Sequence, residues 1–134
     1  MNSLIFKTAI LTAFLGIYAI PRSTALPLTD ADNKTLQGIA SWYSENDPGI
    51  KKTTANMEVF DDSQLTCAMW NVPMNALLKV TNLKNKKFVI VRVNDRGPAK
   101  RLFAQNRIVD LSQAAFSQIA DRGVGLIPVK IEFL

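Results

Sequence analysis

Short apolar segments alternate with polar, turn-rich segments along most of this 134-residue chain. Residues 88–93 (FVIVRV) are the clearest case, because β-branched residues favour extended strands. In residues 128–134 apolar and charged side chains alternate, which is the period of a strand with one buried face. The pattern as a whole predicts strands at residues 38–43, 65–69, 77–82, 88–93, 107–111 and 128–134.

One segment has helical spacing instead. Ser112 is a favourable N-cap residue for a helix over residues 113–120, in which Phe116 and Ile119 fall on the same side. Gly123 stands where a helix-ending glycine is common. Several short strands with one short helix, and no internal repeat, predict a small β-barrel.

The first 25 residues have the layout of a secretory signal peptide. Lys7 precedes a 13-residue run without charge at residues 8–20, and Pro21 ends that run. Small residues at Ser23 and Ala25 predict cleavage after Ala25. The alternative is a retained membrane anchor, but the run is shorter than the roughly 20 residues that span a bilayer. We therefore expect an exported chain, periplasmic or extracellular, with no membrane anchor after cleavage.

Cleavage would leave residues 26–134, which are 109 residues. Residues 26–37 are polar and aperiodic, and this pattern predicts a flexible arm ahead of a single domain at residues 38–134. The only cysteine, Cys67, does not follow the apolar run, so an N-terminal lipid anchor is not expected. We expect a monomer.

Composition limits the chemistry. The chain has no histidine and one cysteine, which excludes His-based nucleophile systems, His-ligated metals and an intramolecular disulfide. We expect neither a metal site nor a cofactor. The net charge of +5 falls to +3 after cleavage, which suits an anionic polymer and is too small to indicate nucleic-acid binding.

Three polar segments carry candidate carboxylates: residues 54–58, 94–98 and 107–112. Each has a structural explanation as well. Glu58 can be a surface charge, Asp95 can cap the turn predicted at residues 94–98, and Asp110 can pair with Arg107. Carboxylates at the loops of a barrel can also converge on a groove, where one of them protonates a glycosidic oxygen.

The order of the sequence blocks resembles the RlpA (rare lipoprotein A) family. These blocks are GIASWY at 38–43, TAN and Glu58 at 54–58, LT at 65–66, VTNL at 80–83, VRVNDRGP at 91–98 and IVDLS at 108–112. The resemblance implies a mainly β fold, a six-stranded double-psi β-barrel with one short helix, related to expansin barrels. It also implies a lytic transglycosylase that cleaves peptidoglycan glycan strands and forms 1,6-anhydro-muramic acid.

The resemblance assigns catalysis to Glu58 and Asp95, either of which can be the acid while the other stabilises positive charge. The positions expected to support catalysis or contact the glycan are Asp110, Arg96, Asn94, Asn56, Trp42, Tyr43 and Trp70. The alternative for Trp42 is packing within the barrel. Met69 stands where the family has a histidine, and Met57 replaces a glycine in a turn that needs positive φ.

These departures keep two other functions open. One is a non-catalytic, expansin-like module that binds cell-wall glycan. The other is a secreted protein-interaction or inhibitor module, since barrels of this kind serve several functions.

Overall fold

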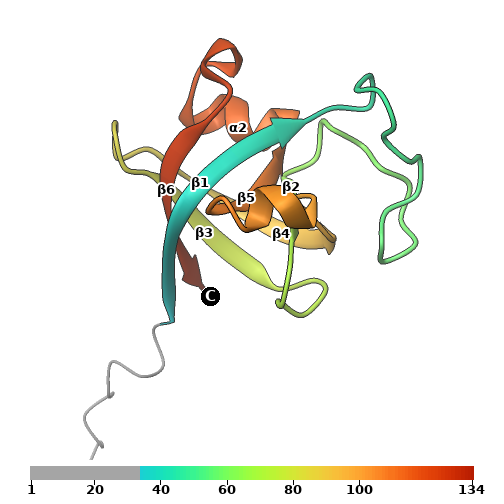
Figure 1. The fold of residues 1–134 in the computed structure, drawn as a ribbon, viewed down its shortest axis with the longest axis horizontal. Helices are drawn as coiled ribbons and strands as arrows, with labels where there is room; N and C mark the ends of the chain where they lie inside the picture. The colour runs from blue at the N-terminus through green and yellow to red at the C-terminus, as the bar shows by residue number, and fades with distance from the viewer. Residues whose placement is uncertain (1–33) are drawn as a thin grey trace, which may run out of the picture.

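The computed structural model describes residues 34–134, which form one closed barrel of six strands (Figure 1). The predicted signal peptide and most of the predicted arm lie outside the described residues. The strands are β1 (Thr35–Tyr43), β2 (Thr66–Met69), β3 (Leu77–Asn82), β4 (Phe88–Asp95), β5 (Arg107–Ser112) and β6 (Ile127–Phe133). The helices are α1 (Lys100–Phe103), α2 (Gln113–Ile119) and the 3-10 turn η2 (Arg122–Val124).

The strand order around the barrel is β1-β5-β2-β4-β3-β6, and β6 pairs with β1 to close it. The pairs β1–β5 and β2–β4 are parallel, and the other pairs are antiparallel. All six predicted strands and the barrel class are confirmed.

Several predicted boundaries were wrong. β1 begins at Thr35 and not at Gly38, because residues 35–37 pair with β6. β4 continues through Asn94 and Asp95, which we had predicted as a turn, because Asp95 pairs with Ala68 of β2. Long-range pairing therefore extends both strands beyond what their own sequences indicate.

The predicted helix is α2. Ser112 Oγ accepts the Ala115 N–H at 3.2 Å, which confirms the N-cap. The helix does not end at Gly123, because Ala120 is already extended and Gly123 lies within η2. The helix α1 was not predicted. Within residues 34–134, no helix is long and apolar enough to cross a membrane.

The core lies inside the barrel and beneath α2, which contacts β1, β4 and β5 (Figure 1). In β4 the side chains of Val89, Val91 and Val93 are at most 2% exposed, while Phe88 and Ile90 point outward. This alternation separates an interior apolar face from an outer face. The ends of β1 and β4, together with the loop that follows β1, carry the candidate site.

Candidate functional site

A row of paired residues positions the site across four strands. Ser41 of β1 pairs with Asp110 of β5, Asp110 pairs with Ala68 of β2, and Ala68 pairs with Asp95 of β4. Directly paired residues project to the same side of a sheet, and a register shift between Cys67 and Ala68 pairs Asp95 with Ala68 although Val93, two residues earlier, faces the interior. The small side chain of Ala68 therefore separates two carboxylates on the outer face of the barrel.

Asp95 lies in a cavity of about 390 Å³, together with Tyr43, Thr54, Lys51 and Arg96. Its Oδ1 accepts the backbone N–H groups of Ala55 at 3.0 Å and of Arg96 at 2.8 Å. Its Oδ2 accepts no hydrogen bond from residues 34–134. One oxygen thus fixes the carboxylate, and the other is available to a ligand in the cavity.

The pocket-facing phenol of Tyr43 does not have the predicted stacking role. Its ring already stacks on Phe60, with centroids 4.6 Å apart and planes 11° apart, and the residue is 9% exposed. Burial, and secondarily the charge of Asp95, raises the pKa of the Tyr43 hydroxyl far above its usual range. That buried hydroxyl has no hydrogen-bond partner among the described residues. Tyr43 is therefore a neutral hydrogen-bond donor beside Asp95.

Glu58 is held as a carboxylate. Arg92 binds it with two hydrogen bonds, Nη1 to Oε1 at 2.6 Å and Nη2 to Oε2 at 2.9 Å. Asn56 adds a hydrogen bond to Oε1 at 2.8 Å, and Asn94 adds one to Oε2 at 3.4 Å. These contacts, Arg92 first, lower the pKa of Glu58 to about 2.

Both carboxylate oxygens of Glu58 already accept hydrogen bonds, and Glu58 does not line the Asp95 cavity. Of the two candidate acids, the geometry leaves Asp95. Asn56 and Asn94, which were predicted to support catalysis or contact the glycan, both donate hydrogen bonds to Glu58. The role of Arg92 was not predicted from the sequence. Arg92 is the one charged residue in the apolar segment 88–93, and a charge in such a segment indicates that a partner of opposite charge lies nearby.

Asp110 belongs to a different network. Ser41 Oγ donates to Asp110 Oδ1, and Arg107 Nε lies 3.4 Å from the same oxygen. Gly97 lies against this carboxylate: a Cβ there would come within 3.3 Å of the Ala68 Cβ and 3.6 Å of Asp110 Oδ2. Asp110 does not line the Asp95 cavity, and pairing with Arg107, the structural alternative, is confirmed.

The two tryptophans lie apart from Asp95. Trp42 packs against Phe116, with centroids 6.4 Å apart, and its Nε1 donates to the Arg122 carbonyl. Trp42 thus packs on the barrel, and the predicted contact with substrate is not supported. Trp70 Nε1 donates to the Pro98 carbonyl at 2.6 Å, next to the segment that carries Asp95 and Arg96.

Met57 and Met69 have opposite environments. Met57 has φ 68° and is 82% exposed, which confirms that the turn before Glu58 needs a positive φ. Met69 is 2% exposed and packs in the core cluster with Cys67, whereas Ala68 packs with Tyr43 beneath the cavity. The side chain at position 69 therefore faces the barrel interior and not the Asp95 cavity.

We expect Met69→His to lower the free energy of unfolding by about 2–4 kcal/mol, because it places a polar ring among apolar side chains. We expect it to leave the Asp95 cavity without a new proton donor. Urea unfolding measures the loss, and Met69→Leu is the control, with an expected change below about 1.5 kcal/mol. A Met69→His protein as stable as Met69→Leu would contradict the interior placement.

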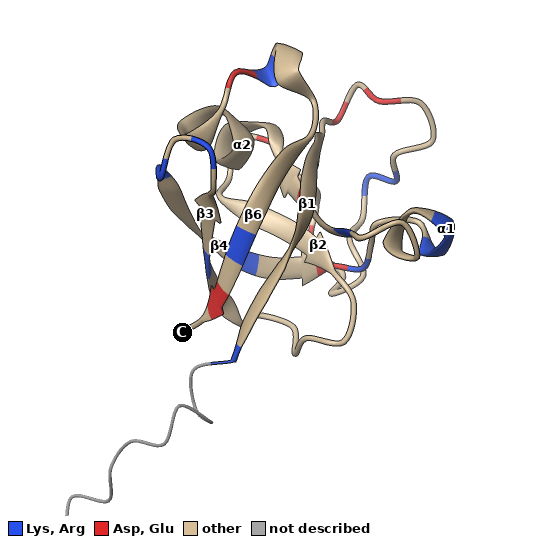
Figure 2. Ribbon diagram, turned by 60° about the vertical axis from the view of Figure 1, so that its left-hand side comes forward, with Lys and Arg blue, Asp and Glu red and all other residues tan. Residues whose placement is uncertain are grey.

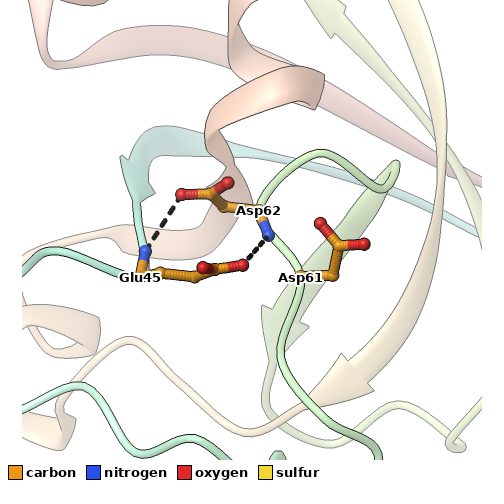
Figure 3. A group of neighbouring side chains, drawn as sticks. All are labelled: Glu45, Asp61 and Asp62. Carbon is orange, nitrogen blue, oxygen red and sulfur yellow. Dashed lines mark hydrogen bonds between the residues drawn. The ribbon is translucent and has the colours of Figure 1, made fainter.

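Three exposed or half-exposed carboxylates, Glu45, Asp61 and Asp62, lie within 4.8 Å of one another (Figure 3). Their oxygens already accept backbone N–H groups: Asp62 from Glu45 at 3.0 Å, Glu45 from Asp62 at 3.2 Å, and Asp61 from Ser63 at 2.9 Å. This arrangement links the loop after β1 to the loop before β2, and we assign it that structural role.

The fold and the site together define a double-psi β-barrel with a carboxylate-bearing cavity on its outer face. The sequence profile of the lytic transglycolase family matches residues 35–131, and the chain belongs to this family. A relative from Campylobacter jejuni, "Endolytic peptidoglycan transglycosylase RlpA", is 47% identical over 118 residues. The match covers 87% of this chain but only 40% of that relative.

Two solved structures have the same fold. The Streptomyces papain inhibitor superposes with a TM-score of 0.59 and 23% identity, covering 75% of this chain and 94% of the inhibitor. The apo expansin of Clavibacter michiganensis superposes with a TM-score of 0.57 and 22% identity, covering 75% of this chain and 50% of the expansin. At this identity the likeness concerns the fold alone.

Proposed function

We propose that this protein is an exported peptidoglycan lytic transglycosylase in which Asp95 is the general acid. The observation that carries the proposal is the Asp95 carboxylate, fixed through Oδ1 and open at Oδ2 within a cavity. The naming of the Campylobacter relative supports the reaction class. We place the protein in the periplasm or outside the cell, where peptidoglycan lies.

The reaction needs one proton-carrying group. A glycan that fills the cavity displaces water from around Asp95. Asp95 Oδ2 gives its proton to the glycosidic oxygen as the bond between that oxygen and C1 breaks. The C6 hydroxyl oxygen of the muramic acid then bonds to C1, and its proton passes to the Asp95 carboxylate. This step restores Asp95 to its acid form and consumes no water.

The surrounding groups assist by charge and orientation. Glu58 keeps its negative charge throughout, because Arg92, Asn56 and Asn94 bind its ionised form. Glu58 also fixes Asn94, the residue that immediately precedes Asp95. The Tyr43 hydroxyl is buried without a partner among the described residues, and its ring forms part of the cavity wall beside Asp95.

The test is product analysis on purified glycan strands without stem peptides. Transglycosylation yields 1,6-anhydro ends, whereas hydrolysis yields reducing ends that are heavier by one water, so mass spectrometry separates the two. We expect anhydro ends only. Reducing ends would overturn the ring-closure mechanism. Binding without any cleavage would instead assign the chain to the expansin-like alternative, and saturable binding to a protein with none to glycan would favour the inhibitor alternative.

A further inference from the structure

A second hollow lies beside the segment that follows Asp95, where Trp70 contacts Pro98. It consists of two adjoining cavities of about 370 and 310 Å³ that share Trp70, Asn71 and Phe103, and we call it the Trp70 groove. None of its lining residues lines the Asp95 cavity. It is therefore a separate site within residues 34–134.

The floor and walls of the Trp70 groove combine aromatic rings with amides. Trp70, Phe103 and Phe133 supply three rings from different parts of the chain, and Phe103 is 37% exposed. The amide side chains of Gln37, Asn71 and Asn106 lie on the exposed rim. Aromatic faces pack against the C–H faces of sugar rings, and amides exchange hydrogen bonds with sugar hydroxyls.

The ring of Trp70 is held in place before any ligand arrives. Its Nε1 donates to the Pro98 carbonyl at 2.6 Å, which fixes one edge of the indole. A side chain that is already ordered loses less conformational entropy when a ligand binds. The groove is thus preorganised at its central ring.

The charge of the groove selects for anions. Lys100 Nζ lies 5.7 Å from the Trp70 ring centroid, and Lys34 Nζ lies 5.5 Å from that of Phe133. Arg101 follows Lys100 in α1 but does not line the groove, and α1 shows blue positions and no red ones in Figure 2. Within residues 34–134, none of these three cations forms an ion pair with a carboxylate. A ligand that presents a carboxylate beside a sugar ring can pair with the lysines and stack on the aromatic rings.

The Trp70 groove is also joined to the proposed active site. Trp70 contacts Pro98, and Arg96 Nη1 donates to the Met69 carbonyl at 2.9 Å. The segment after β2 and the segment after β4 are therefore connected at two points. A polymer that follows the segment at residues 95–98 can contact both the Asp95 cavity, which Asp95 and Arg96 line, and the Trp70 groove, whose Trp70 contacts Pro98.

We propose that the Trp70 groove is a second glycan site, which binds a carboxylate-bearing sugar of the cell-wall strand. This inference rests on the proposed function for the identity of the polymer. Trp70 and Phe103 stack on sugar rings, and Lys100 pairs with the carboxylate. The site adds affinity for long strands and takes no part in proton transfer.

Binding is measured in an Asp95→Asn background, so that the glycan stays intact. The sequence has two tryptophans, so adding Trp42→Phe leaves Trp70 as the only one and makes its fluorescence report on the groove. The probes are peptide-free peptidoglycan strands, which carry carboxylates, and chitin oligosaccharides, which are neutral. We expect the peptidoglycan strands to change Trp70 emission at a concentration at which chitin does not.

Variants of the groove complete the test, with binding measured by sedimentation with the same strands. We expect Phe103→Ala to weaken binding about tenfold through loss of stacking. We expect Lys100→Gln to weaken it about threefold at low salt and less at high salt. The matched controls are Phe88→Ala and Lys79→Gln, which alter a similar lysine–aromatic pair, 4.5 Å apart, on the outer face of β3 and β4.

Unchanged Trp70 emission with peptidoglycan strands would overturn the inference, as would groove variants that bind like the controls. Trp70→Ala is not needed, so loss of the Pro98 contact does not confuse the result. If the wild-type protein forms anhydro ends while the groove variants bind normally, the groove inference alone fails. If the groove binds glycan while the wild-type protein forms no anhydro ends, the proposed activity alone fails.

Discussion

Asp95→Asn is expected to slow glycan cleavage by about 10²–10⁴-fold, because an amide cannot supply the proton that the leaving oxygen requires. The fold should persist. Asparagine Oδ1 can still accept the two backbone N–H groups, of Ala55 and Arg96, that now bind the carboxylate. The measurement is the initial rate of anhydro-end formation, together with the thermal midpoint of unfolding.

The control for this change is Asp121→Asn, which makes the same substitution at an exposed residue in front of η2. Asp121 caps η2 and does not line the Asp95 cavity. We expect Asp121→Asn to cleave at the wild-type rate. Equal rates for Asp95→Asn and Asp121→Asn would assign proton transfer to another group.

Arg92→Met is expected to release Glu58 and to lower cleavage by about 10–10²-fold, because small displacements near a reacting group are costly. Glu58 would keep only its amide contacts with Asn56 and Asn94. The pKa of Glu58 should then rise from about 2 toward its ordinary value of 4.5. Activity in the variant should fall on acidification at a higher pH than in the wild type.

The same pKa shift makes a prediction for stability. A carboxyl whose pKa is lowered on folding contributes stability above its unfolded pKa, and this contribution is lost as pH falls through the folded value. In the wild type the Glu58 contribution therefore disappears between about pH 4.5 and pH 2. Urea unfolding across that range should show a smaller loss in Arg92→Met. Arg92→Lys is the control, since it keeps the charge and loses the two-point contact.

One outcome would contradict the role given to Arg92. If Arg92→Met has the wild-type pH profile for cleavage and the wild-type loss of stability on acidification, then the ion pair does not set the protonation of Glu58. The Arg92→Lys result separates charge from geometry, because both variants remove the two-point contact but only one removes the charge.

The sequence predicted the fold well because the barrel is built from strongly patterned strands. β3 was predicted with its observed bounds, and β4 missed only its last two residues. Local patterns do not report where pairing with a distant strand begins or stops. The errors at Thr35 and Asp95 are of that kind, since partners more than 25 residues away decide both.

The site was predicted in part. Asp95, Glu58, Asn56 and Asn94 were found through the sequence blocks and do lie close together, as their hydrogen bonds show. Which carboxylate is bound in an ion pair could not be predicted, because it depends on Arg92, 34 positions from Glu58 in sequence.

Side-chain direction was the other unpredictable feature. Asp110 and Trp42 occupy blocks typical of the family, yet one pairs with Arg107 and the other packs on Phe116. The direction of the side chain also matters at Met69. Its side chain lies in the barrel interior, so the loss of a histidine at this position does not remove a group from the Asp95 cavity.

The pairing of β1 with β6 has a consequence for how this barrel is built into larger proteins. Thr35, at the start of β1, pairs with Glu132, near the end of β6, so the two ends of the domain leave it side by side. A barrel with adjacent ends can be inserted into another chain, or appended to one, without stretching either connection. We infer that the domain can be joined to other chains at either end without a change in its fold. A short linker between residues 134 and 35, with new termini in an exposed loop, would give a circular permutant that still folds.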